Sequence, residues 1–132
     1  MLVNLGQPNS GIPLLPTGSL IETNGKFGHE LIAGPIVGNQ QVVGHKEPGS
    51  GAHPEFIGSA ARRYPFARVI PPVNNEHGMV SWQRMRHQFG DPWAPLDNCQ
   101  HAARRAYLGR AESPTVTLIF MGLLALPLFM KD

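Results

Sequence analysis

Glycine and proline recur along this chain at a density that few helical folds accommodate. The 132 residues include 15 glycines and 13 prolines. Both residues break helices, so the chain cannot be a simple bundle of helices. Hydrophobic residues make up 42% of the sequence, enough for one core, and the length fits one compact domain. We therefore expect a single turn-rich domain over residues 1–132.

Short apolar segments separated by turn signals fill the first third of the chain. Asn24-Gly25 and Gly38-Asn39 are pairs that accept the positive φ of hairpin turns. They predict an antiparallel meander of three strands, over Ser19–Thr23, His29–Val37 and Gln40–His45. The polar, glycine-rich segment Glu47–His53 is typical of an exposed loop.

The clearest helix is predicted over Cys99–Leu108. Asp97 or Asn98 can cap its start, and Gly109 suits its C-terminal cap. Its small residues recur at helical spacing and predict a buried face made of Cys99, Ala102, Ala103, Ala106 and Tyr107, opposite Gln100, Arg104 and Arg105. The other predicted elements are a short helix within Phe56–Arg63, a strand over Arg68–Pro72 and a helix over Ser81–Phe89 with Ser81 as its N-cap. Together they indicate an α+β fold, a small antiparallel sheet packed against helices.

The segment Ser113–Met130 carries no charged residue. Its length just reaches that of a membrane span, which needs about 17–25 residues. Thr115, Thr117 and Pro127 weaken that interpretation. Burial in the core as a strand and helix is favoured over a membrane span, and an interfacial anchor is a third option.

Charge and cysteine content exclude several classes of protein. The formal net charge is only +2, and no run of Lys or Arg is present, so we expect no nucleic-acid partner. The single cysteine, Cys99, excludes an intramolecular disulfide. No basic segment precedes the first apolar stretch, which argues against a cleaved secretory signal and for a cytoplasmic protein, with membrane association through the apolar tail as an option.

Cys99 is the strongest candidate for a catalytic residue in this sequence. It stands at the start of a predicted helix, where N–H groups and the helix dipole stabilise a thiolate. The turn around Asn98 and Cys99 can aim backbone N–H groups at an oxyanion. His29 and His45 lie on neighbouring predicted strands, so that His29 can serve as a base for the thiol and His45 can orient it. The alternative for Cys99 is a small buried hydrophobe.

Three segments resemble the lecithin:retinol acyltransferase-like proteins. Gly18–Pro48, with its Leu-Ile-Glu strand and Val-Val-Gly-His strand, is similar to the first catalytic segment of that family. Asp97–Val116, which begins Asp-Asn-Cys-Gln-His, is similar to the family's Asn-Cys-Glu-His-Phe helix and the segment that trails it. Val80–Gly90 is similar to the helix before the nucleophile.

The resemblance implies a circularly permuted papain-like fold of the NlpC/P60 type. It implies Cys99 as nucleophile, His29 as general base and His45 as the second histidine, with Gly44 as one extra residue before it. The chain departs from the family where Gln100 replaces Glu, Ala102 replaces Phe and Glu30 replaces an aromatic residue. The implied activity is that of a cysteine-dependent hydrolase or acyltransferase that acts on an ester, thioester or amide through an acyl-enzyme.

Two other functions stay open from the sequence. One is a peptidoglycan-type amidase or endopeptidase, and the other is a non-catalytic binding module that retains the fold. The expected partners are an acyl-lipid or peptide substrate and, through the tail, a membrane surface. We expect no cofactor and no metal, since Cys99 and His101 lack two further ligands. The remaining polar residues are interpreted as solvated (His53, Glu76, His77, His87, and the arginine face of Arg84, Arg86, Arg104 and Arg105).

Overall fold

A computed structural model describes residues 8–25 and 28–109 of the chain. In this part the protein is α+β, with one five-stranded antiparallel sheet and three α-helices. The strands are β1 (Leu20–Thr23), β2 (Glu30–Val37), β3 (Gln40–Glu47), β4 (Gly51–Phe56) and β5 (Phe66–Ile70). The helices are α1 (Ile57–Arg63), α2 (Asn75–His87) and α3 (Cys99–Leu108), and a short 3-10 turn, η2, covers Pro8–Gly11.

The sheet has the strand order β4-β3-β2-β1-β5. Consecutive strands from β1 to β4 are neighbours, and β5 returns to pair with β1 at the other edge. The turn between β2 and β3 places Gly38 at φ 69°, a left-handed conformation that glycine adopts at low cost. Leu31 pairs with His45 in this hairpin, and His45 pairs with His53 in the next.

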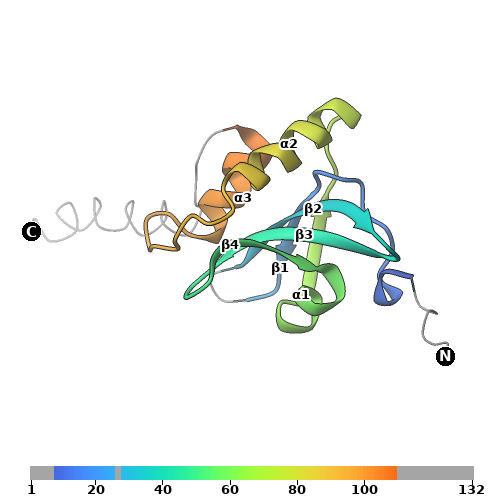
Figure 1. The fold of residues 1–132 in the computed structure, drawn as a ribbon, viewed down its shortest axis with the longest axis horizontal. Helices are drawn as coiled ribbons and strands as arrows, with labels where there is room; N and C mark the ends of the chain where they lie inside the picture. Colours follow the sequence, from blue (N-terminus) through green and yellow to red (C-terminus); the bar gives the residue numbers. More distant parts are fainter. Residues whose placement is uncertain (1–7, 26–27, 110–132) are drawn as a thin grey trace, which may run out of the picture.

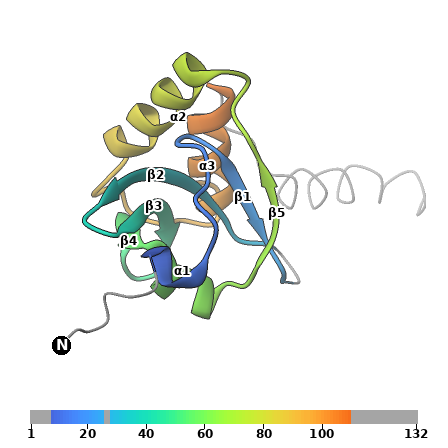
Figure 2. The ribbon, with the colours of Figure 1, turned by 90° about the vertical axis from the view of Figure 1, so that its right-hand side faces the viewer.

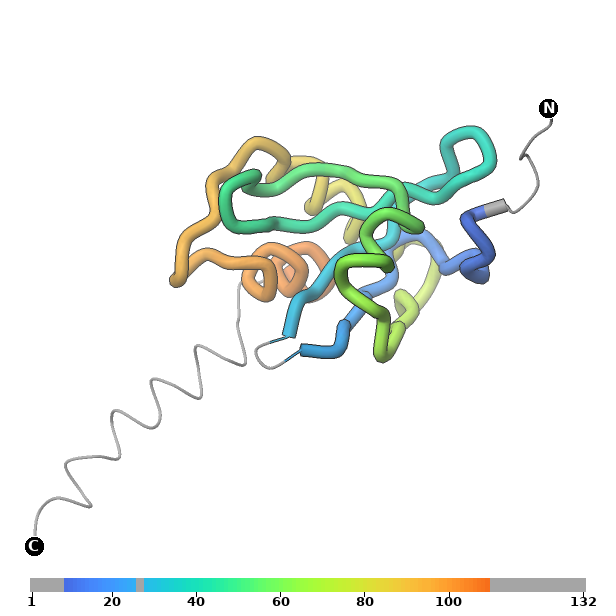
Figure 3. The backbone as a smooth tube through the Cα atoms, turned by 90° about the horizontal axis from the view of Figure 1, so that it is seen from below, coloured from blue at the N-terminus to red at the C-terminus, as the bar shows by residue number. Residues whose placement is uncertain are grey.

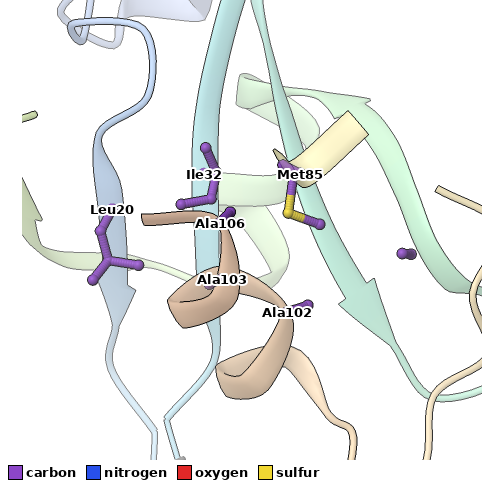
Figure 4. Close-up of a cluster of buried hydrophobic side chains, with 7 residues drawn as sticks. Leu20, Ile32, Met85, Ala102, Ala103 and Ala106 are labelled. Atoms are coloured by element: carbon purple, nitrogen blue, oxygen red, sulfur yellow. The ribbon is translucent and has the colours of Figure 1, made fainter. Parts of the chain in front are cut away.

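Helices cover both faces of the sheet (Figures 1 and 2). α2 and α3 pack side by side on one face, and α1 lies on the opposite face. Strand alternation sends Leu20 and Ile32 toward α2 and α3, while Ile21 and Leu31 face α1. Figure 4 shows how small the buried residues of α3 are; beside Met85, the labelled members of this core are Leu20, Ile32, Ala102, Ala103 and Ala106. The alanines allow α3 to lie close to the sheet.

Two glycines make room for the side chains of α2. A Cβ on Gly34 would lie 2.6 Å from Trp82, and a Cβ on Gly44 would lie 2.6 Å from Met85. Gly34 lies within β2 and Gly44 within β3, and side chains of α2 occupy the space that a Cβ would need. These glycines therefore serve the packing of α2 and not a turn. Gly44, the extra residue before His45, is thus required by the close contact of helix and sheet.

The structure confirms most of the predicted elements. The three-strand meander is present, α3 has the predicted bounds, and Gly109 ends it in a left-handed conformation at φ 81°. α1 lies within the predicted short helix, and β5 begins before the predicted strand Arg68–Pro72.

Two predictions were wrong. The predicted loop Glu47–His53 shrinks to an exposed turn at residues 48–50, because β3 continues to Glu47 and β4 begins at Gly51. Pairing between these strands makes a polar, glycine-rich segment regular. α2 begins at Asn75 rather than Ser81, since the Asn74 side chain caps it by accepting from the His77 N–H, and Ser81 is buried within the helix.

The predicted apolar tail, Ser113–Met130, lies outside the described residues. Among the residues that are described, no helix has the length and apolar character needed to cross a membrane.

Candidate active site

Two of the predicted site residues, His29 and His45, are in direct contact. His29 immediately precedes β2 and is 8% exposed, while His45 lies in β3 and is fully buried. The pairing of Leu31 with His45 places both imidazoles on the face that α1 covers. The Nε2 atom of His29 is 2.7 Å from the Nδ1 atom of His45.

A carboxylate fixes the proton positions of this pair. His45 Nε2 is 2.7 Å from Oε1 of Glu55, and a carboxylate can only accept, so Nε2 of His45 carries its proton. Nδ1 of His45 is then an acceptor, and Nε2–H of His29 donates to it. Nδ1 of His29 is left with its lone pair, and it has no hydrogen-bond partner among the described residues.

The Cys99 sulfur lies close to the backbone of the two residues that flank His29. Cys99 is the first residue of α3, whose N-cap Asn98 accepts from the N–H groups of Gln100 and His101. The sulfur is 3.9 Å from the carbonyl oxygen of Gly28, and the N–H of Glu30 stabilises its thiolate. The sulfur therefore contacts the backbone on both sides of His29, although no hydrogen bond between the thiol and the His29 ring is found in the described part of the chain.

Burial favours the neutral form of both the Cys99 thiol and the His29 imidazole. It raises the pKa of the Cys99 thiol, and the nearby N–H groups of Glu30, Gln100 and Cys99 offset only part of this effect. The expected stabilisation of a thiolate by the N–H groups of the helix start is present, but burial outweighs it. Burial, with help from His45, lowers the pKa of His29 to about 3. A neutral imidazole can accept a proton, so this pair suits general-base activation of a neutral thiol.

The two backbone N–H groups predicted to bind an oxyanion, those of Asn98 and Cys99, differ in whether they already have a hydrogen-bond acceptor. The N–H of Asn98 points at Nδ1 of His101, 3.2 Å away, in a reciprocal capping arrangement. This contact explains His101 as a capping residue. The N–H of Cys99 makes no such contact and stabilises its own sulfur. Of the two predicted donors, Cys99 is the one whose N–H is directed toward the Cys99 sulfur.

Tyr64 belongs to the site and was not predicted. Its ring stacks on His29, with centroids 3.8 Å apart and an angle of 20° between the planes. Its hydroxyl donates to Oε2 of Glu47 at 2.6 Å. Burial and this hydrogen bond raise the pKa of Tyr64 to about 12. The stacked ring restricts the His29 imidazole to one orientation.

Glu47, His53 and Glu55 were also missed as neighbours of His45. His53 is not simply solvated as predicted, because its Nε2 is 3.1 Å from Oε1 of Glu47. The reason for the error is the unrecognised strand β4, which pairs His53 with His45. A sequence signal does exist: a histidine is followed two residues later by a glutamate both in β3 and in β4. Alternation of side chains places such pairs on one face.

Ion pairs made by Arg104 and Lys46 hold α3 and the segment before it against the sheet. Arg104 donates to both carboxylate oxygens of Glu30 at 2.9 Å and also reaches Glu22, so the prediction that it is solvated was wrong. The fully buried Lys46 of β3 lies 3.1 Å from Asp97, two residues before Cys99. Figure 3 shows the segment between α2 and α3 beside the β3–β4 turn, where Ala52 exchanges backbone hydrogen bonds with Gly90 and Asp91.

Comparisons of the chain with models of known protein families, with curated proteins and with solved structures found no match. The α+β class and the strand order stand on the coordinates alone.

Proposed function

We propose that the protein is a cysteine-dependent hydrolase or acyltransferase, with Cys99 as nucleophile and His29 as general base. The observation that carries the proposal is the chain of contacts from Glu55 through His45 to His29, beside the helix start that bears Cys99. This relay leaves one imidazole nitrogen free to accept a proton. A purely structural histidine pair has no need of that arrangement.

The proposed reaction begins with the transfer of the Cys99 thiol proton to Nδ1 of His29. The sulfur attacks the carbonyl carbon of an ester, thioester or amide, and the N–H of Cys99 donates to the resulting oxyanion. The leaving group departs with the proton from His29, and an acyl-enzyme remains on Cys99. Water or an acceptor amine or hydroxyl, deprotonated by His29, then takes the acyl group.

His45 and Glu55 are positioning residues in this scheme. They hold His29 with its proton on Nε2, and they stabilise the imidazolium that forms when the thiol is deprotonated. Tyr64 adds a stacking contact that fixes the ring. None of the three touches the reacting atoms.

The resemblance to lecithin:retinol acyltransferase-like proteins supports an acyl-lipid substrate and a permuted papain-like fold. The order of His29, His45 and Cys99 along the chain is consistent with that permutation, and the antiparallel sheet with α3 across it is compatible with the family's fold. A cytoplasmic location with contact to a membrane surface belongs to the same proposal, and a peptide amide is the alternative substrate.

Turnover of a panel of acyl donors tests the function. Lipid esters, acyl thioesters and short peptide amides are incubated with the protein and with a Cys99→Ala variant. We expect release of the acyl group from at least one donor class and its loss in the variant. Activity that survives in Cys99→Ala would overturn the proposal, and no turnover of any donor would favour a binding module.

A further inference from the structure

Four metal-binding side chains gather on the α1 face of the β3–β4 hairpin. His45 and Glu47 come from β3, and His53 and Glu55 come from β4. The register pairs His45 with His53, and the period of two places all four side chains on one face. One ligand atom from each residue lies within 4.8 Å of the other three.

The distances between these atoms match a four-coordinate ion. His45 Nε2 is 2.7 Å from Glu55 Oε1 and 3.5 Å from Glu47 Oε1. His53 Nε2 is 3.1 Å from Glu47 Oε1 and 3.9 Å from Glu55 Oε1. Zinc bonds to nitrogen and oxygen are about 2.0–2.2 Å, so a tetrahedron of such ligands has edges of about 3.3–3.6 Å. The four distances between histidine nitrogens and glutamate oxygens lie on either side of that length, and no two of the ligand atoms are more than 4.8 Å apart.

The second oxygen of each carboxylate is already held. Tyr64 donates to Oε2 of Glu47 at 2.6 Å, and Ser59 donates to Oε2 of Glu55 at 2.7 Å. Both Oε1 atoms are thereby directed to the point on which the histidines converge. Outer contacts of this kind orient the ligands of metal sites.

Arg63 presently neutralises the two carboxylates. Its Nη2 atom donates to Oε1 of Glu47 and to Oε1 of Glu55. The Arg63 side chain is 48% exposed, whereas the Glu47 and Glu55 side chains are 9% and 13% exposed. The guanidinium can therefore move into solvent while the carboxylates stay in place, and a divalent ion can replace it.

We propose that His45, Glu47, His53 and Glu55 form a zinc site whose occupation switches off the thiol chemistry. The inhibitory part rests on the proposed function. A zinc ion on Nε2 of His45 requires the lone pair of that nitrogen, so the proton of His45 resides on Nδ1. Nδ1–H then donates to Nε2 of His29, and the His29 proton resides on Nδ1. Each imidazole keeps one proton and stays neutral, but His29 has no lone pair left for Cys99.

Binding is tested on the full chain without an affinity tag. Zinc is titrated by calorimetry, and Co²⁺ is used as a spectroscopic probe because four-coordinate Co²⁺ absorbs strongly in visible light. We expect one ion per chain with a four-coordinate spectrum, loss of both signals in His53→Ala, and no change in His87→Ala, which removes an exposed histidine elsewhere. Arg63→Ala removes the competing cation and is expected to bind about two- to fivefold tighter.

The proton switch is tested independently of activity. Nitrogen-15 spectra of the histidines are expected to show His29 protonated on Nε2 without zinc and on Nδ1 with zinc. Zinc is expected to suppress acyl transfer by the wild type and not by His53→Ala. Equal binding by His53→Ala and the wild type, or an unchanged His29 proton with zinc bound, would overturn the proposal. Because binding and spectra are read without turnover, their failure is distinguishable from failure of the proposed function.

Discussion

The Nε2 atom of His29 and the Nδ1 atom of His45 lie 2.7 Å apart in a part of the fold where both rings are almost fully buried. A buried imidazole pair can form this contact only if one ring donates and the other accepts. Glu55 settles the direction, because its carboxylate accepts a hydrogen bond from Nε2–H, the single N–H of the His45 ring. The consequence is a free lone pair on the nitrogen of His29 that is not bound to His45.

Replacing His45 with alanine tests that consequence. Without its acceptor, His29 loses its fixed tautomer, and we expect kcat/KM to fall by about 10- to 1000-fold, less than the loss in Cys99→Ala. The fall is expected in kcat, with KM little changed, because His45 does not touch substrate. His53→Ala is the matched control, since it removes a neighbouring imidazole that does not contact His29 through a hydrogen bond. Equal losses in both variants would argue against a positioning role.

Two substitutions at Tyr64 separate its ring from its hydroxyl. Tyr64→Phe keeps the stack on His29 and loses only the hydrogen bond to Glu47, so we expect nearly full kcat and a loss of about 1 kcal/mol of unfolding free energy. Tyr64→Leu removes the stacked ring, and a larger fall in kcat is expected. Steady-state kinetics and urea unfolding measure the two effects. If both variants lose the same fraction of kcat, the stacked ring does not position His29.

The buried histidines make stability depend on pH. The folded pKa of His29 is about 3 and that of His45 is also lowered, whereas an exposed histidine titrates near 6.5. The unfolded chain therefore binds more protons below pH 6.5. Their stabilising contribution is present at neutral pH and is lost as the pH falls from about 6.5, at up to about 1.4 kcal/mol per pH unit for each group. Urea unfolding at several pH values measures this slope, and a slope in His29→Gln as steep as in the wild type would contradict the prediction.

Gly44→Ala tests the contact between sheet and α2. The added Cβ would lie 2.6 Å from the Met85 side chain and 3.1 Å from the Phe89 side chain, so these side chains or α2 must shift. We expect a loss of about 1–3 kcal/mol of unfolding free energy, as for other overpacked cores. Thermal or urea unfolding provides the measurement. A Gly44→Ala variant as stable as the wild type would show that the helix has room to move.

Local signals in the sequence were sufficient to predict the strands and the helix that position His29, His45 and Cys99. Turn pairs such as Gly38-Asn39 and the capping residues around Cys99 depend on neighbouring residues only, so the turn of the hairpin and both ends of α3 were predicted correctly. β4 was missed because its regularity comes from pairing with β3 across a polar, glycine-rich segment. Because β4 was missed, the positions of His53 and Glu55 beside His45 were missed as well. The repeated His-x-Glu pattern was the one local sign of that face.

The protonation state of Cys99 and the ion pairs of Arg104 could not be predicted from the sequence, because both depend on the assembled fold. The position of Cys99 at a helix start favours a thiolate, but burial raises its pKa, and burial is a property of the assembled fold. Likewise, a charged residue such as Arg104 is expected to be solvated, yet in the fold it forms ion pairs with Glu30 and Glu22.

In the proposed reaction, Cys99 carries an acyl group after activation by His29. Mass spectrometry of the intact protein and of its peptides, after brief exposure to an acyl donor and acid quenching, tests it most directly. We expect one acyl adduct, mapped to Cys99 as a hydroxylamine-sensitive thioester and absent or strongly slowed in His29→Ala. An adduct that maps to another residue, or that forms on Cys99 equally fast without His29, would contradict it.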